Sequence, residues 1–159
     1  MSNWWETSLA EVLQIHHGFA FSGDGFMDQG EHLVLTPGNF CLSGGLQVRP
    51  GKERYFDQDF DPKWLLGPGD LVIAMTDLKQ SAPILGSTAR IPEQGKFLHN
   101  QRIGLVELIA DKLDERFAYY LLNSELVRSQ LRASATGSTV RHTAPARIES
   151  CQIKIPPIE

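Results

Sequence analysis

Lysine and arginine are missing from the beginning of this chain, because none precedes Arg49 in a sequence of 159 residues. The same stretch holds five acidic residues, whereas residues 49–159 hold all 15 basic residues and the other 14 of the 19 acidic ones. The later part therefore has a net charge of +1, while the whole chain has −4. A protein that binds nucleic acid by charge alone is more basic than this, so a polyanionic partner is permitted but not required.

Cysteines and long apolar runs are also scarce. Cys41 and Cys151 are the two cysteines; they lie far apart and fit no C-x-x-C or disulfide framework. We therefore expect free thiols and a cytoplasmic location. No run approaches the roughly 20 apolar residues that cross a bilayer, and residues 1–12 lack the basic and apolar regions of a secretory signal. We expect no membrane partner.

Catalytic signatures are missing as well. The sequence contains no H-E-x-x-H, G-x-S-x-G, Walker loop or G-x-G-x-x-G after a strand. His16 and His17 are adjacent, which places them on opposite faces of a strand and makes them poor paired ligands. We expect a non-catalytic protein with no metal and no cofactor. A small hydrolase or metal enzyme stays open as an alternative, with these residues gathered around an ion: His99, His142 or Asp28.

The elements that are present predict strands first and helices late. Short apolar runs bounded by glycine or proline predict strands beginning at Ile15 and at 32–35, 46–48, 71–75, 84–91, 103–109 and 151–155. Apolar residues at helical spacing predict a helix over 114–135 with a bend near Ser124, and short helical turns are expected within 8–14 and 143–150. This order indicates an α+β fold with a twisted, mostly antiparallel β-sheet core and C-terminal helices packed on it. We expect residues 1–159 to form one domain.

Polar side chains directly follow the apolar strand at 71–75, and this is the strongest candidate site. Between Asp77 and Arg102, four cations are interleaved with Ser, Thr, Asn and Gln. Such side chains read the edges of DNA bases, and mounting them at strand ends would fix their geometry. We expect a single electropositive rim with these DNA-contacting residues: Lys79, Gln80, Ser81, Arg90, Lys96 and Arg102.

Other interpretations of the polar residues stay open. An ordinary polar surface loop is the alternative for the whole 77–102 segment, and Asn100 and Gln101 could instead hold the returning strand by backbone hydrogen bonds. The basic segment 49–55 is a further candidate loop. Three residues near the end of the chain are expected to support the fold or touch phosphate: Ser138, Thr139 and Arg141.

Six segments, in this order, resemble the target recognition domain of type I restriction–modification specificity subunits, and together they span nearly the whole chain. They are Trp4-x4-Leu9 with Glu11-Val12 and Gly18-Phe19-Ala20-Phe21; Gly69-Asp70-Leu71-Val72-Ile73-Ala74 with Thr76; Asn100-Gln101-Arg102-Ile103; Phe117-x2-Tyr120-Leu121-Leu122-x-Ser124; Ala135-x-Gly137-Ser138-Thr139; and the segment 148–159. Two features depart from the family pattern. Asp77 stands where the family often has a small residue, and the chain stops at PPIE, where a long spacer helix should begin. We therefore expect an excised single domain or a half-subunit.

The resemblance implies sequence-specific recognition of double-stranded DNA, with one domain reading one half of a bipartite target. A partner methyltransferase (modification) subunit would flip and methylate an adenine there, and a restriction/translocase subunit would dock on the same complex. A second specificity domain is a further partner that the resemblance allows. The alternative is a protein-interaction module of another DNA-methylation or phage-defence assembly, which would bind its partner through the apolar helix face at 117–131.

Overall fold

The computed structural model describes residues 3–158, and the β-strands in that range are short. The longest, β11, has six residues. The strands are β1 (Trp5–Ser8), β2 (Leu13–His17), β3 (Phe26–Met27), β4 (His32–Val34), β5 (Tyr55–Phe56), β6 (Leu65–Leu66), β7 (Leu71–Ala74), β8 (Thr76–Asp77), β9 (Thr88–Arg90), β10 (Lys96–Leu98), β11 (Ile103–Leu108), β12 (Arg141–His142) and β13 (Gln152–Ile155). The helices are α1 (Glu115–Asn123), α2 (Glu125–Ser134) and α3 (Pro145–Glu149), with 3-10 turns at 9–11, 23–25, 37–39 and 62–64.

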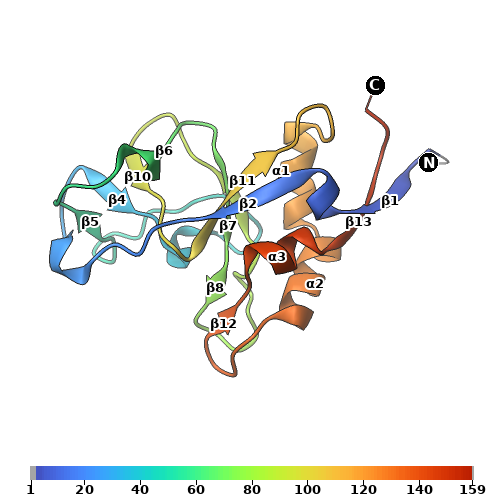
Figure 1. The fold of residues 1–159 in the computed structure, drawn as a ribbon. Helices are drawn as coiled ribbons and strands as arrows, with labels where there is room; N and C mark the ends of the chain where they lie inside the picture. The colour runs from blue at the N-terminus through green and yellow to red at the C-terminus, as the bar shows by residue number, and fades with distance from the viewer. Residues whose placement is uncertain (1–2, 159) are drawn as a thin grey trace.

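A four-stranded antiparallel sheet, ordered β2-β11-β7-β9, lies at the centre of the molecule (Figure 1). Both faces of β7 are covered. Leu71 and Ile73 belong to the core that the helices share, while Val72 and Ala74 belong to a second core on the opposite face. This burial on both faces explains why β7 reads as a continuous apolar run without polar alternation.

A second, five-stranded sheet packs beyond the first and is ordered β3-β5-β4-β10-β6. It occupies the left of Figure 1, and its pair β4–β10 is parallel, whereas the other strand pairs in residues 3–158 are antiparallel. The expected β-sheet core therefore consists of two main sheets. The strand expected at 84–91 is shorter than predicted, because only 88–90 pairs with β7 and Gly86 before it has a φ of +82°.

The expected late helix is confirmed, including its bend. The Asp114 carboxylate caps α1 by accepting the backbone N–H groups of Arg116 and Phe117. Ser124 has extended backbone angles and ends α1 before α2 begins. The apolar stripe that includes Leu121 and Leu131 packs into the protein's own core, so most of the face considered for a protein partner is covered.

The α+β class and the mostly antiparallel pairing are confirmed. The expected strands at 71–75, 103–109 and 151–155 correspond to β7, β11 and β13. The ribbon of β1 with β13 and the β8–β12 pair were not predicted, and the strand expected at 46–48 is reduced to a single bridge between Phe40 and Leu46. Cys41 and Cys151 are free thiols. Among the described residues, no helix is long and apolar enough to cross a membrane.

Candidate nucleic-acid interface

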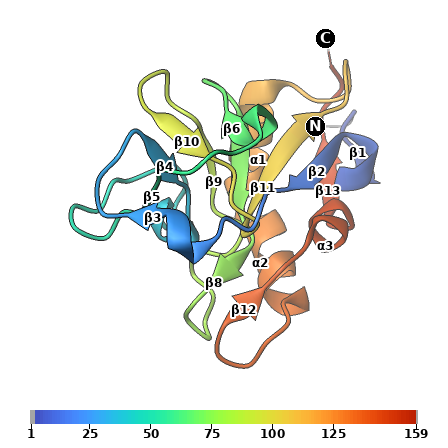
Figure 2. The same cartoon turned by 60° about the vertical axis from the view of Figure 1, so that its left-hand side comes forward.

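A two-stranded ribbon projects from the central sheet at the lower end of the molecule (Figures 1 and 2). The chain leaves β7 through Met75 and enters β8, which pairs antiparallel with β12 so that Asp77 lies opposite Arg141. The Thr76 hydroxyl lies 3.1 Å from Nδ1 of His142. The pairing brings together two loops that are far apart in sequence, at 78–83 and 136–140, and we call these two loops the tip.

Asp77 organises the first loop of the tip from inside. The residue is 4% exposed. Its Oδ1 accepts the backbone N–H of Lys79 at 2.9 Å, and its Oδ2 accepts that of Ile84 at 2.5 Å. The carboxylate thus fixes both ends of the loop, which also turns through a positive φ of 50° at Ala82. The departure from the family's small residue therefore has a structural role here.

Arg128 of α2 holds the returning end of that loop. It is 4% exposed, and its guanidinium donates to the carbonyls of Leu85 at 3.2 Å, Pro83 at 2.6 Å and Leu42 at 2.5 Å. Burial lowers the pKa of this guanidinium, because removal from water disfavours its charged form; neighbouring Arg132 lowers it further. Arg128 thereby ties the tip and the 41–45 loop to one helix.

Arg141 holds the two loops of the tip against each other. Its guanidinium donates to the carbonyls of Gln80 at 3.0 Å, Ala135 at 3.2 Å and Arg132 at 3.4 Å. These contacts agree with the expectation that Arg141 supports the fold. Gly137, with a φ of +91°, makes the turn that starts the second loop. The tip leaves several predicted residues exposed to solvent: Lys79, Gln80, Ser81, Ser138 and Thr139.

The structure does not bring all the predicted cations together, so the expectation of a single rim over 77–102 is wrong. Arg90 lies in β9 and forms an ion pair with Glu115. Lys96 lies in β10 of the five-stranded sheet and pairs with Glu31. Arg102 is exposed. It lies where the ribbon leaves the central sheet, because its carbonyl accepts the N–H of Met75. The segment crosses two sheets between the tip and Arg102, and this separates the side chains.

The lesser candidates have mainly structural contacts. Asn100 accepts the backbone N–H of Arg102 through Oδ1 at 3.2 Å, as its structural interpretation predicted. In the basic segment 49–55, Arg49 pairs with Glu53, and Arg54 pairs with Asp28.

The histidines considered for a metal site do not converge. Within residues 3–158, no three His, Cys, Asp or Glu side chains are placed to hold a metal ion together. His99 is buried, lies edge-on to Trp64 and hydrogen bonds through Nε2 to the carbonyl of Ile103 at 2.6 Å. His142 belongs to the ribbon, where it contacts Thr76.

Sequence reasoning missed Arg128, although a signal for it exists. Arg128 falls at helical spacing between the buried Leu121 and Leu131, where an amphipathic helix normally carries an apolar residue. A charged residue in that position indicates a buried partner. Its carbonyl partners lie in distant loops, and the sequence pattern does not contain them.

The chain belongs to the Type I restriction modification DNA specificity domain family, which matches it over residues 1–159. It is similar to the EcoBI specificity subunit of a type I restriction enzyme from Escherichia coli, with 26% identity over 156 residues, which are 98% of this chain and 30% of that protein.

Two solved structures share the fold. The S subunit of a type I restriction–modification system from M. genitalium has a TM-score of 0.66 and 17% identity over 96% of this chain and 34% of its own. The HsdS subunit from Thermoanaerobacter tengcongensis has a TM-score of 0.62 and 16% identity over 98% of this chain and 34% of its own. The chain therefore spans about a third of the length of these relatives.

Proposed function

We propose that this chain is a target recognition domain that reads one half of a bipartite sequence in double-stranded DNA. The observation that carries this proposal is the β8–β12 pairing, which joins two polar loops into one projecting tip. The family to which the chain belongs is named for DNA specificity. A two-stranded ribbon is narrow enough to enter the major groove, which is about 12 Å wide.

The contacts around the tip favour base reading over a loosely solvated loop. Asp77, Arg128 and Arg141 fix the backbone from which the polar side chains project. A loop that is ordered before binding loses less conformational entropy in the complex, which favours selective recognition. Lys79 and Gln80 are the side chains we assign to base edges, and Arg102 beside the ribbon is assigned to phosphate.

The chemistry belongs to partner subunits in this proposal. A modification subunit flips and methylates an adenine in the half-site, and a restriction/translocase subunit acts on the same complex in the cytoplasm. A second specificity domain reads the other half-site. The net charge of −4 agrees with a domain that supplies base contacts while its partners supply much of the charge that neutralises phosphates.

The test is methylation of a randomised target library by the complex reconstituted with its modification subunit. We expect Lys79→Ala and Gln80→Ala to change the half-site that is methylated, because each well-aligned base contact contributes about 1–3 kcal/mol of discrimination. Lys63→Ala is the matched control, since Lys63 is an exposed cation beside Asp61 in the 62–64 turn. The proposal fails if every tip variant leaves selectivity as it is in the wild type.

A further inference from the structure

A hollow of about 330 Å³ lies directly beside the tip. Ser81 and Pro83 of the first tip loop form one side of it, and Leu42 forms another. Arg128 and Arg132 of α2 close the hollow from the helix side. The first tip loop and two arginines therefore line the same space.

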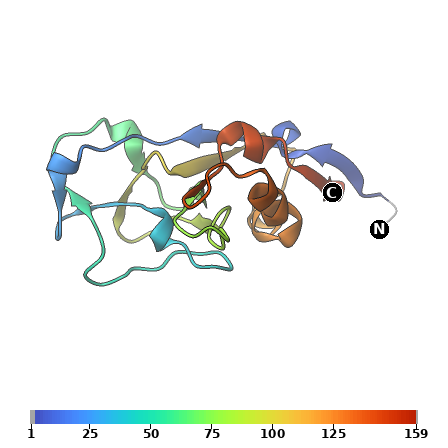
Figure 3. The ribbon, with the colours of Figure 1, turned by 90° about the horizontal axis from the view of Figure 1, so that it is seen from below.

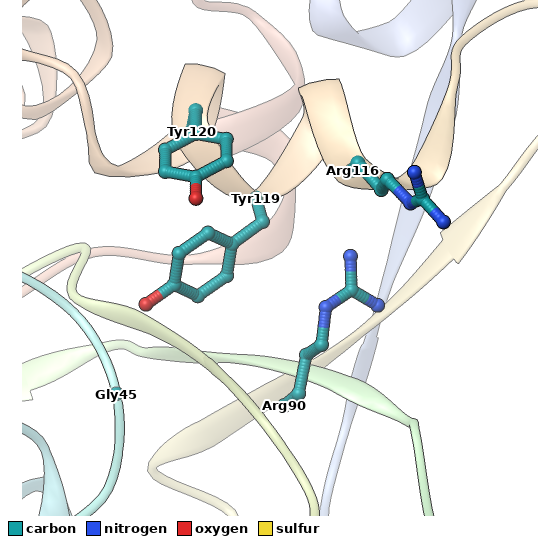
Figure 4. Close-up of a pocket in the computed structure, with 5 residues that line it drawn as sticks. All are labelled: Gly45, Arg90, Arg116, Tyr119 and Tyr120. Atoms are coloured by element: carbon teal, nitrogen blue, oxygen red, sulfur yellow. The ribbon is translucent and has the colours of Figure 1, made fainter.

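A second hollow, of about 380 Å³, lies beside the preceding helix, α1. It is lined by two arginines, Arg90 and Arg116, and by Gly45, Tyr119 and Tyr120. Figure 4 shows the guanidinium groups of Arg90 and Arg116 approaching each other beside the start of α1. The guanidinium carbon of Arg90 also lies 5.9 Å from the centre of the Tyr119 ring.

The two hollows lie on either side of a close contact between the 41–45 loop and α1, and we call the pair of hollows the arginine groove. Leu42 and α2 line the first hollow, and Gly45 and α1 line the second. Figure 3 shows the ribbon of the two helices, in orange, from below. The 41–45 loop and α1 are in close contact between the two hollows, because a Cβ at Gly44 would lie 2.6 Å from Nδ2 of Asn123. Asn123 in turn hydrogen bonds to both the N–H and the carbonyl of Thr88 on β9. Arg116 and Arg132 are at most about 24 Å apart along the helices, which is roughly seven nucleotide steps.

The groove carries positive charge in a chain that is acidic overall. Four arginines line it, and the two acidic residues beside them, Glu115 and Glu125, each form an ion pair with an arginine. Arg116 forms no ion pair within residues 3–158. The opposite end of the molecule carries these exposed acidic residues: Asp24, Asp28, Glu31, Asp57, Asp59 and Asp61.

We propose that the arginine groove binds successive phosphates of one DNA strand beside the base pairs that the tip reads. This inference rests on the proposed function and adds a second contact surface to it. An arginine has five N–H donors, so Arg90 and Arg132 can keep their carboxylate partners while they donate to a phosphate. The hydroxyl groups of Tyr119 and Tyr120 are neutral donors of the kind that contact phosphate oxygens.

The experiment measures binding of the 159-residue chain to short labelled DNA duplexes of several sequences over a range of salt concentrations. We expect Arg116→Gln to weaken binding by the same factor for every sequence and to reduce the slope of log K against log salt by about 0.9, the effect of one phosphate contact. Arg132→Gln should act in the same way. Lys154→Gln on β13 removes the same charge outside the groove and should leave the slope unchanged.

One further variant tests the charge of the groove. Glu115→Gln removes an anion beside the groove and should strengthen DNA binding.

If Arg116→Gln and Arg132→Gln leave the slope unchanged while Lys79→Ala alters base preference, the groove does not bind phosphate and the proposed function stands. If the groove variants instead reduce binding of polyglutamate and leave DNA binding unchanged, the groove is a site for an acidic protein segment. If the wild-type chain binds no duplex at any salt concentration, the groove proposal is overturned, whereas the proposed function is decided by the methylation test with the reconstituted complex.

Discussion

The carboxylate of Asp77 accepts a hydrogen bond from the backbone N–H of Ile84, seven positions further along the chain, and so closes the loop that carries Lys79, Gln80 and Ser81. The other carboxylate oxygen accepts the N–H of Lys79 at the start of that loop. One buried side chain therefore defines where the loop begins and ends.

Asp77→Asn should destabilise the protein and reduce the base selectivity of the tip. An asparagine keeps one acceptor but turns the other position into a donor that faces a backbone N–H. A buried donor left without an acceptor costs about 1–3 kcal/mol, and urea unfolding measures this cost. Asp61→Asn is the matched control, because exposed Asp61 also accepts the N–H two residues on, and asparagine serves equally well there. Equal stability of the two variants would contradict the role given to Asp77.

Arg128→Met should loosen both the tip and the 41–45 loop. The substitution removes the donors to the Leu85, Pro83 and Leu42 carbonyls, and we expect a loss of about 2–4 kcal/mol in the free energy of unfolding. Hydrogen exchange should quicken at the amide of Gly45, which bonds to Thr88. Arg128→Lys should have an intermediate effect, because a lysine lacks the planar fork that reaches separate carbonyls.

Arg147→Met on α3 is the control for this effect. Arg147 is half-buried at another surface of the helices, and its guanidinium has no hydrogen bond within residues 3–158. We expect it to leave exchange at Gly45 unchanged. If hydrogen exchange at Gly45 is fast in both Arg128→Met and Arg147→Met, general destabilisation explains it and the specific role of Arg128 is contradicted.

Gly137→Ala should distort the second loop of the tip. Gly137 has a φ of +91°, and an added Cβ would lie 1.9 Å from the carbonyl oxygen of Val140. The strain costs about 1–3 kcal/mol, which thermal unfolding can detect, and a change in the methylated half-site should accompany it. Gly23→Ala is the control, because a Cβ at Gly23 meets no atom within 4 Å. A Gly137→Ala protein with wild-type stability and selectivity would rule out this role for the turn.

Acidification should destabilise the fold through His99. Burial lowers the pKa of its imidazole below the ordinary value of 6.5, because a charged ring loses its hydration inside the protein. The unfolded chain therefore binds more protons than the folded one between the lowered pKa and pH 6.5. The contribution of neutral His99 to the stability of the fold is complete above pH 6.5 and decreases as the pH falls through that window.

Denaturant unfolding at several pH values tests the His99 prediction. We expect the His99→Gln protein to lose less stability than the wild type between pH 7 and about pH 5, even if its stability at pH 7 is lower. His32→Gln, a change at a half-buried histidine, serves as the control for the general effect of removing an imidazole. Parallel pH profiles for the wild type and His99→Gln would exclude this mechanism.

Local pattern was sufficient to predict the main elements of the fold. The apolar run of β7, the helical period of α1 and α2 and the cap at Asp114 each depend on residues within a few positions of one another. These signals operate through backbone propensity and periodic burial, which a single sequence contains. The bend at Ser124 followed from the same kind of local signal.

The candidate site was predictable only in part, for a related reason. Lys79, Gln80 and Ser81 follow a strand directly, so their display at its end could be expected. Arg90 and Lys96 are surrounded in the sequence by the same kinds of polar residues as Lys79. The fold nevertheless places them in two different sheets, where they pair with Glu115 and Glu31. Composition indicates which side chains are suited to DNA, and it does not indicate which of them share a surface.

The sequence by itself determined the α+β class, the order of strands before helices and the rigid strand that leads into a polar loop. Only the tertiary structure decided that this loop pairs with the segment at Arg141 and that Arg128 braces it from α2. The physical reason is the range of the interactions. Secondary structure depends on neighbours in the chain, whereas the carbonyl of Leu42 reaches Arg128 across 86 positions and becomes its partner only when the whole core has formed.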